Sequence, residues 1–241
     1  MKLIKMLCLT LVLVMSFAVC AQAETLIVGT NPEFSPFEYV GDDGVITGID
    51  IDIVKAIAGK LGYDVKVEAI DWNGLIPALT SGKVDLLIAG MTITEERKQS
   101  VLFTDPYYNA TQAIIVMAEG SPVAAEADMH GKKIAVIMGY TGDLYISENF
   151  TDSEIVRYDK SMDAVQDLVN GRVDAVVLDE APAKVYERQG IGVTVLPDRL
   201  SNEEYGIAFK KEDTELVAKF NEALAQIMSD GTLDNIVSQY Y

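Results

Sequence analysis

The sequence contains very little cysteine and histidine. Its two cysteines, Cys8 and Cys20, both lie in the apolar N-terminal stretch, and its one histidine, His130, lies in a polar turn. Once that stretch is removed the chain can form no disulfide, and a core of this size does not need one. Protein-bound transition metals usually need several Cys or His ligands. We therefore expect neither a metal site nor a cofactor.

Positive charge is also scarce. The chain has 19 Lys and Arg residues against 37 Asp and Glu residues, a formal net charge of −18. This balance argues against nucleic acid and anionic membrane surfaces as partners. Beyond the N-terminal stretch, no apolar run approaches the roughly 20 residues that cross a bilayer. We expect a soluble mature chain with no nucleic-acid partner.

The N-terminus has the pattern of a secretory signal. Two lysines precede the apolar run 6–19, and Ala-Gln-Ala at 21–23 supplies small residues at the cleavage site. These features predict a signal peptide over 1–23. The alternative is a lipid anchor at Cys20, but Val19 stands where a small residue should precede the cysteine.

The segment 90–97, Gly-Met-Thr-Ile-Thr-Glu-Glu-Arg, follows a largely apolar run, 84–89, that predicts a buried strand. Ligands of open α/β sheets bind at the carboxyl ends of such strands. The planar guanidinium of Arg97 suits a carboxylate, and Thr92 can both donate and accept a hydrogen bond. The segment could therefore hold the zwitterionic end of an amino acid. The alternative is an ordinary loop in which Thr94 caps a helix and Arg97 is solvated.

A second segment repeats this pattern. Residues 82–90 match residues 171–179 in character, and an amphipathic helix precedes each of them. Two copies of one helix-turn-strand unit indicate two α/β lobes of similar build. The register sets Gly90 opposite Asp179, each at the carboxyl end of its strand. If the lobes face each other, we expect these two residues to face each other across a cleft.

Two further loops carry candidate residues. Prolines keep the aromatic loop 31–39 out of helix, and Phe34 within it could form a pocket wall or cap the core. Trp72, the only tryptophan, follows another strand and has the same two interpretations. In 139–143, the amides of Tyr140 and Thr141 would stand at a helix N-terminus, which attracts anions.

The chain resembles the polar amino-acid-binding proteins of bacterial ABC importers, which are family 3 extracellular solute-binding proteins with the type II periplasmic-binding fold. The matching segments occur in order along the mature chain: 48–53 with the helix that follows, 90–97, 103–108 and 205–209. The resemblance implies an α/β fold of two lobes joined by two crossing hinge strands. Asp50, in the first segment, falls at the start of its helix, where carboxylates are favoured.

The resemblance also implies a domain layout and a cellular role. We expect a periplasmic monomer that binds a polar amino acid and docks on a membrane permease. The expected divisions are 1–23 for the signal peptide, 24–106 and 206–241 for the first lobe, 107–111 and 201–205 for the hinge, and 112–200 for the second lobe.

Roles for individual residues follow from the resemblance. Arg97 would clamp the α-carboxylate, and Asp179 would take the α-ammonium, which pairs each ligand charge with an opposite one. Phe34 and Trp72 would hold the ligand side chain between them. The full set of expected ligand-binding residues is Asn31, Phe34, Trp72, Gly90, Met91, Thr92, Arg97, Tyr140, Thr141 and Asp179.

The resemblance leaves the ligand open. Members that take cationic side chains often carry an acid where this chain has Asn31, although Glu33 and Asp71 could restore negative charge. Glutamine, arginine, histidine and lysine all stay possible.

Cyclohexadienyl dehydratases, which act on arogenate or prephenate, share the fold and use an acid in the cleft. Glu180 or Glu33 could take that role here. Because Arg97, Thr92 and Asp179 match the set that binds a zwitterion, we expect a receptor with no catalytic residue.

Overall fold

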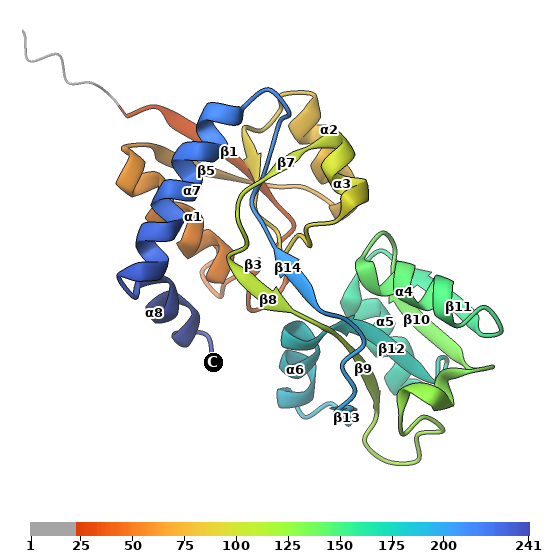
Figure 1. Cartoon of the computed structure of the whole chain (residues 1–241). Helices are drawn as coiled ribbons and strands as arrows, with labels where there is room; N and C mark the ends of the chain where they lie inside the picture. The colour runs from red at the N-terminus through yellow and green to blue at the C-terminus, as the bar shows by residue number, and fades with distance from the viewer. Residues whose placement is uncertain (1–22) are drawn as a thin grey trace, which may run out of the picture.

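The computed structural model describes residues 23–241. Residues 1–22, with Cys20 and nearly all of the predicted signal peptide, lie outside it. The chain folds into two α/β lobes connected by two extended strands (Figure 1). This is the type II two-lobed fold that the resemblance implies. Within residues 23–241, no helix is long and apolar enough to cross a membrane.

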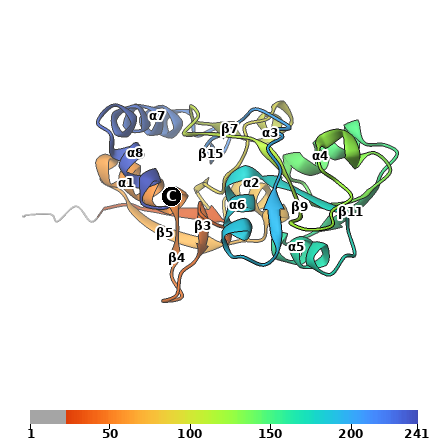
Figure 2. The ribbon, with the colours of Figure 1, turned by 90° about the horizontal axis from the view of Figure 1, so that it is seen from below.

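Lobe 1 is a five-stranded sheet with helices on both faces. Its strands, in spatial order, are β5 (Asp64–Ala69), β1 (Thr25–Thr30), β6 (Leu86–Leu87), β15 (Ala208–Phe209) and β7 (Leu102–Phe103). One face carries α1 (Ile49–Leu61), α7 (Thr214–Ser229) and α8 (Thr232–Ser238), and the other α2 (Leu75–Thr80) and α3 (Glu95–Ser100) (Figure 1 and Figure 2). β1 runs parallel to β5 and β6, whereas β15 runs antiparallel to its neighbours.

Small elements complete the lobe. The sheet of β2 (Glu33–Phe34), β3 (Glu38–Val40) and β4 (Ile46–Thr47) leads into α1, and the short helix η1 (Trp72–Gly74) follows β5. The strand predicted over 84–89 is shorter than expected, because only Leu86 and Leu87 form regular pairs. The amides of Asp85 and Ile88 still donate to carbonyls of β1, so the backbone there stays extended.

Lobe 2 repeats the plan. Its strands, in spatial order, are β11 (Glu154–Tyr158), β10 (Lys133–Ile137), β12 (Ala175–Asp179), β9 (Gln112–Met117) and β13 (Val193–Val195). Its helices are η2 (Glu126–Met129), α4 (Thr141–Asn149), α5 (Ser161–Val169) and α6 (Glu180–Arg188). β10 runs parallel to β11 and β12, and β9 runs antiparallel to β12 and β13. The units α2–β6 and α5–β12 are the two copies that the sequence repeat predicts.

Two strands join the lobes. β8 (Tyr108–Ala110) and β14 (Glu203–Tyr205) pair antiparallel, with Tyr205 opposite Tyr108 and Glu203 opposite Ala110. Figure 1 shows both strands passing between the lobes in opposite directions. The chain therefore reaches lobe 2 through β8 and returns to lobe 1 through β14.

Candidate ligand-binding site between the lobes

Loops from both lobes surround a small cavity of about 10 Å³. Most of them follow the carboxyl ends of β1, β5, β6, β10 and β12, where α/β sheets bind ligands. The cavity is lined by Phe34, Trp72, Ala89, Gly90, Thr92, Arg97, Tyr140, Thr141 and Asp179. Residues 34 to 97 come from lobe 1 and residues 140 to 179 from lobe 2, so the fold brings most of the predicted site residues together.

Arg97 extends from lobe 1 to lobe 2. The helix cap at Thr94 fixes its backbone, since the Thr94 hydroxyl accepts from the Arg97 amide at 3.1 Å. Its guanidinium donates to the Thr92 carbonyl at 2.8 Å and to the Gly139 carbonyl of lobe 2 at 3.1 Å, and it lies 5.1 Å from the Trp72 ring centre. Burial lowers the pKa of Arg97, whereas Glu203 and Asp179 raise it. Because a guanidinium has five N–H donors, this group can also bind a carboxylate.

Asp179 ends β12 and is 4% exposed. Its Oδ1 accepts from the Tyr205 hydroxyl at 2.5 Å. Burial, followed by the nearby Glu203 carboxylate, raises the pKa of Asp179 to about 7, and the Tyr205 and Gln112 contacts oppose that rise. A cationic group placed beside Asp179 would favour its ionised form.

Gly90 has a left-handed backbone with φ of +51°. A Cβ atom there would approach the Phe34 ring to 2.5 Å, so only glycine allows this ring to pack on the loop. The Gly90 amide donates to Asp50 Oδ2 at 2.7 Å. Next along the loop, the Thr92 hydroxyl donates to Glu203 Oε2 at 2.6 Å.

Three aromatic rings surround the cavity. The Tyr140 ring of lobe 2 contacts the Phe34 ring at a centroid distance of 5.8 Å and the Trp72 ring at 4.6 Å. Phe34 is buried against Phe37 and Tyr205. From the sequence, Tyr140 is expected to contribute only its backbone amide, but its side chain also lines the site.

Two predicted site residues lie outside this cavity. Asn31 is buried and donates to the Ile70 carbonyl at 3.2 Å, and it lines an outer hollow together with Glu33 and Asp71. Met91 lines a neighbouring hollow beside Arg97.

Glu203, on the hinge strand β14, is a site residue that sequence reasoning missed. Its Oε2 accepts from the hydroxyls of Thr92 in lobe 1, at 2.6 Å, and Thr141 in lobe 2, at 2.7 Å. Its place on a predicted hinge strand is the signal that could have indicated it. With Asp179 it sets two carboxylates against the single guanidinium of Arg97.

Gln112, at the start of β9, is a second residue that was missed. It is fully buried and its Nε2 donates to the Thr141 hydroxyl at 3.1 Å. Within residues 23–241, its Oε1 has no hydrogen-bond donor. No local sequence pattern marks it, because its position depends on how β9 crosses from the hinge into lobe 2.

A pair of buried acids lies beneath the Gly90 loop. Asp50 accepts from the Gly90 amide and, at 2.9 Å, from the Tyr107 hydroxyl. Glu38 is 1% exposed, and neither of its oxygens has a partner in the part of the chain that the structure describes. Burial and then the nearby Asp50 carboxylate raise the pKa of Glu38 well above its usual value, and burial raises that of Asp50 to about 6. Asp50 therefore holds the binding loop in addition to starting α1.

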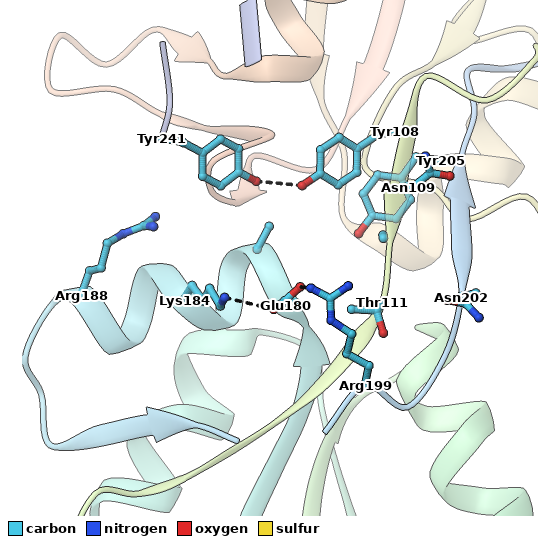
Figure 3. A pocket seen from close by; sticks show the side chains of 12 residues that line it. Tyr108, Asn109, Thr111, Glu180, Lys184, Arg188, Arg199, Asn202, Tyr205 and Tyr241 are labelled. Atoms are coloured by element: carbon cyan, nitrogen blue, oxygen red, sulfur yellow. Dashed lines mark hydrogen bonds and ion pairs between the residues drawn. The ribbon is translucent and has the colours of Figure 1, made fainter. Parts of the chain in front are cut away.

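The two acids considered for a dehydratase lie elsewhere. Glu180 pairs with Lys184 at 3.0 Å and with Arg199 at 3.2 Å, in a separate cleft behind the hinge strands (Figure 3). Glu33 pairs with Lys160 at 2.6 Å. Neither acid lines the central cavity.

This arrangement suits binding between two lobes that move about a hinge. Opposite charges stand in one buried cavity with aromatic walls, which fits a small zwitterion. In residues 23–241, no cluster of His, Cys, Asp or Glu is placed to hold a metal ion. Fold and site together define a two-lobed solute-binding protein.

Known proteins agree with this class. The family model described as bacterial extracellular solute-binding proteins, family 3, matches residues 26–241. An L-arginine-binding protein of Pseudomonas aeruginosa is 36% identical, over 95% of this chain and 92% of its own length. A probable histidine-binding protein of Neisseria gonorrhoeae is 34% identical, over 89% of this chain and 82% of its own length. The solved structure of an ancestral arginine-binding protein bound to glutamine has a TM-score of 0.86 at 43% identity, covering 91% of this chain and 99% of that one.

The chain belongs to the family 3 bacterial extracellular solute-binding proteins. It is a solute-binding protein, the class that the resemblance implies, and the relatives above are named as binding proteins.

Proposed function

We propose that this protein captures a cationic polar L-amino acid, arginine first, between its lobes and delivers it to the permease of an ABC importer. The observation that carries the proposal is the cavity lined by two opposite charges, the half-buried Arg97 and the buried Asp179. Arg97 and the amides of Thr92 and Thr141 would bind the α-carboxylate. Asp179 and the Gly90 carbonyl would bind the α-ammonium.

Charge balance favours a cationic side chain. Asp179 lines the cavity and Glu203 binds two residues of its lining, so two carboxylates stand near the guanidinium of Arg97 and a zwitterionic head group leaves one negative charge to be compensated. A guanidinium between Phe34 and Trp72 would also gain cation–π attraction. Glutamine, which lacks that charge, is the competing ligand.

The names of the relatives support the same ligand class, since they specify arginine and histidine. Charge-assisted hydrogen bonds contribute roughly 1.5 to 3 kcal/mol each. Several of them, less the cost of ordering, are compatible with dissociation constants on the order of micromolar or tighter.

The proposal includes the layout of the mature chain. Residues 24–106 and 206–241 would form one moving body and residues 112–200 the other, with 107–111 and 201–205 as the hinge. The pairing of β8 with β14 supports this division. We propose a periplasmic monomer, released from its signal peptide before Glu24.

A thermal-shift screen tests the proposal. Mature protein is freed of co-purified ligand by unfolding and refolding, and its unfolding midpoint is measured with each of the twenty amino acids. A ligand at about 100 times its dissociation constant adds roughly 2.7 kcal/mol of stability. We expect arginine, lysine or histidine to give the largest shift.

Matched variants test whether the thermal shift depends on the proposed binding site. Arg97→Ala and Asp179→Ala should abolish it, because each leaves one ligand charge buried without a partner. Arg172→Ala and Asp152→Asn, which change exposed pairs far from the cavity, should retain it. The proposal is wrong if no amino acid raises the midpoint, or if both site variants respond as the wild type does.

A further inference from the structure

The Tyr140 side chain stands where the two lobes meet. Tyr140 lies between β10 and α4 of lobe 2, yet its ring contacts Phe34 edge-on, with an interplanar angle of 77°, and Trp72 at 59°. Phe34 and Trp72 both belong to lobe 1 and form the walls assigned above to the ligand side chain. A ring of the protein itself therefore lies against both walls of this aromatic slot.

The rings of Phe34 and Tyr140 differ in how firmly the protein holds them. Phe34 is 3% exposed and packs against Phe37, Tyr205 and the Gly90 backbone. Tyr140 is only partly buried and packs against the core from a loop, since it follows Gly139, whose φ is +78°, and precedes the first turn of α4. Of these two rings, Tyr140 is therefore the less firmly held.

Movement of the Tyr140 ring would change the volume available to a ligand side chain. The cavity has a volume of only about 10 Å³, whereas ligand pockets usually measure about 300 to 1,000 Å³. Any ligand side chain that enters the slot therefore needs volume that the Tyr140 ring occupies, and a longer side chain needs more of it.

We propose that Tyr140 determines specificity by competing with the ligand side chain for the slot between Phe34 and Trp72. This inference rests on the proposed function, since it concerns the same amino-acid site. Short side chains displace the ring little, and long side chains must displace it fully. The apparent affinity for long ligands is reduced by the fraction of molecules in which the slot is closed.

The test uses a homologous ligand series, 2,4-diaminobutyrate, ornithine and lysine, which differ only in side-chain length. Calorimetry gives the dissociation constants for wild type, Tyr140→Ala and the matched control Tyr140→Phe. The wild-type constant divided by that of Tyr140→Ala should increase along the series and reach roughly threefold or more for lysine. Tyr140→Phe retains the ring, so the wild-type constant divided by that of Tyr140→Phe should not change along the series. Tyr140→Ser serves the same comparison if the alanine variant does not fold, as judged by circular dichroism.

Trp72 supplies a second measurement, because it is the only tryptophan and lies against Tyr140. Saturating lysine should change the tryptophan emission of the wild type more than that of Tyr140→Ala, in which no ring is displaced. An equal emission change, or a ratio of constants that does not increase with ligand length, overturns the inference. If none of the three ligands binds any of these proteins while arginine binds the wild type, the inference fails and the proposed function stands.

Discussion

At the scale of single residues, the charge of Asp179 is linked to ligand binding. Burial and the Glu203 carboxylate raise its pKa to about 7, while the Tyr205 and Gln112 contacts favour the ionised form. A ligand ammonium would favour ionisation further. Binding should therefore release a proton whenever Asp179 is protonated in the free protein.

We expect the affinity for arginine to decrease as the pH falls below about 7. Each pH unit should cost up to about tenfold, until the bound-state pKa of Asp179 is reached. Calorimetry between about pH 5 and pH 8 measures this slope. Asp179→Asn should bind more weakly and lose the slope. Glu204→Gln, at an exposed position of β14, should retain it.

The same pKa has a consequence for the free protein. Because the folded-state pKa lies above the ordinary value of 3.8, the folded chain binds more protons than the unfolded chain between these two values. The contribution of Asp179 to the free energy of unfolding should then decrease as the pH rises from about 4 to 7. An affinity for arginine that does not change with pH would contradict this account of Asp179.

At the scale of elements, the binding loop is held from below by one carboxylate, that of Asp50. Asp50 at the start of α1 accepts from the Gly90 amide and from Tyr107, which directly precedes β8. Glu38 on β3 lies beside Asp50 and has a strongly raised pKa. Two adjacent buried carboxylates cannot both be ionised cheaply, so the pair holds a proton at neutral pH. The Gly90 loop and Tyr107, beside the hinge strand β8, thus donate hydrogen bonds to the same acceptor, Asp50.

Substitution should separate the roles of these two acids. Asp50→Ala leaves two buried donors without an acceptor and should lower the free energy of unfolding by roughly 1 to 3 kcal/mol for each donor. Glu38→Gln keeps the shape and replaces a neutral acid, so the free energy should stay the same or rise at pH 7. Glu204→Gln, the surface control, should change it by less than about 0.5 kcal/mol. Urea unfolding gives all three values, and an equal loss in Glu38→Gln and Asp50→Ala would show that Glu38 must be ionised.

At the scale of the whole molecule, the lobes are joined by two strands but touch at several points across the cleft. Arg97 reaches Gly139, Lys160 pairs with Glu33, and Tyr205 on the hinge strand reaches Asp179. Exposed ion pairs contribute about 0 to 1 kcal/mol, so the Lys160 pair alone does not hold the lobes together. A ligand that binds both lobes would supply the missing stabilisation of the closed form.

Arginine should therefore make the protein more compact. We expect small-angle X-ray scattering of ligand-free refolded protein to give a larger radius of gyration than the same protein with saturating arginine. Asp179→Ala has the same hinge but lacks the ammonium partner, so arginine should not change its scattering. Identical wild-type curves with and without a bound ligand would rule out closure by hinge motion.

Much of this architecture could be predicted from local patterns. The repeat of 82–90 at 171–179 and the helix before each copy indicate two similar lobes, and its register sets Gly90 and Asp179 at corresponding strand ends. The structure brings both into one cavity. These signals are readable because periodicity, helix capping and strand ends depend on residues close in sequence.

Other features depend on contacts between segments far apart in the chain. Glu203 accepts a hydrogen bond from Thr92, which lies 111 residues earlier in the sequence, and no local sequence pattern predicts that contact. Asp50 has the sequence position of an ordinary helix-end carboxylate, yet it is fully buried beneath the binding loop.

The sequence by itself determined the class of the protein, the two-lobed plan and the opposite charges available to a zwitterion. Only the tertiary structure decided that Glu203 joins the site from the hinge, that Asn31 and Met91 lie outside the cavity, and that the Tyr140 ring enters the slot of the opposite lobe. The physical reason is that strand periodicity and capping are set by neighbouring residues. Which side chains meet across a cleft is instead set by the relative orientation of two lobes.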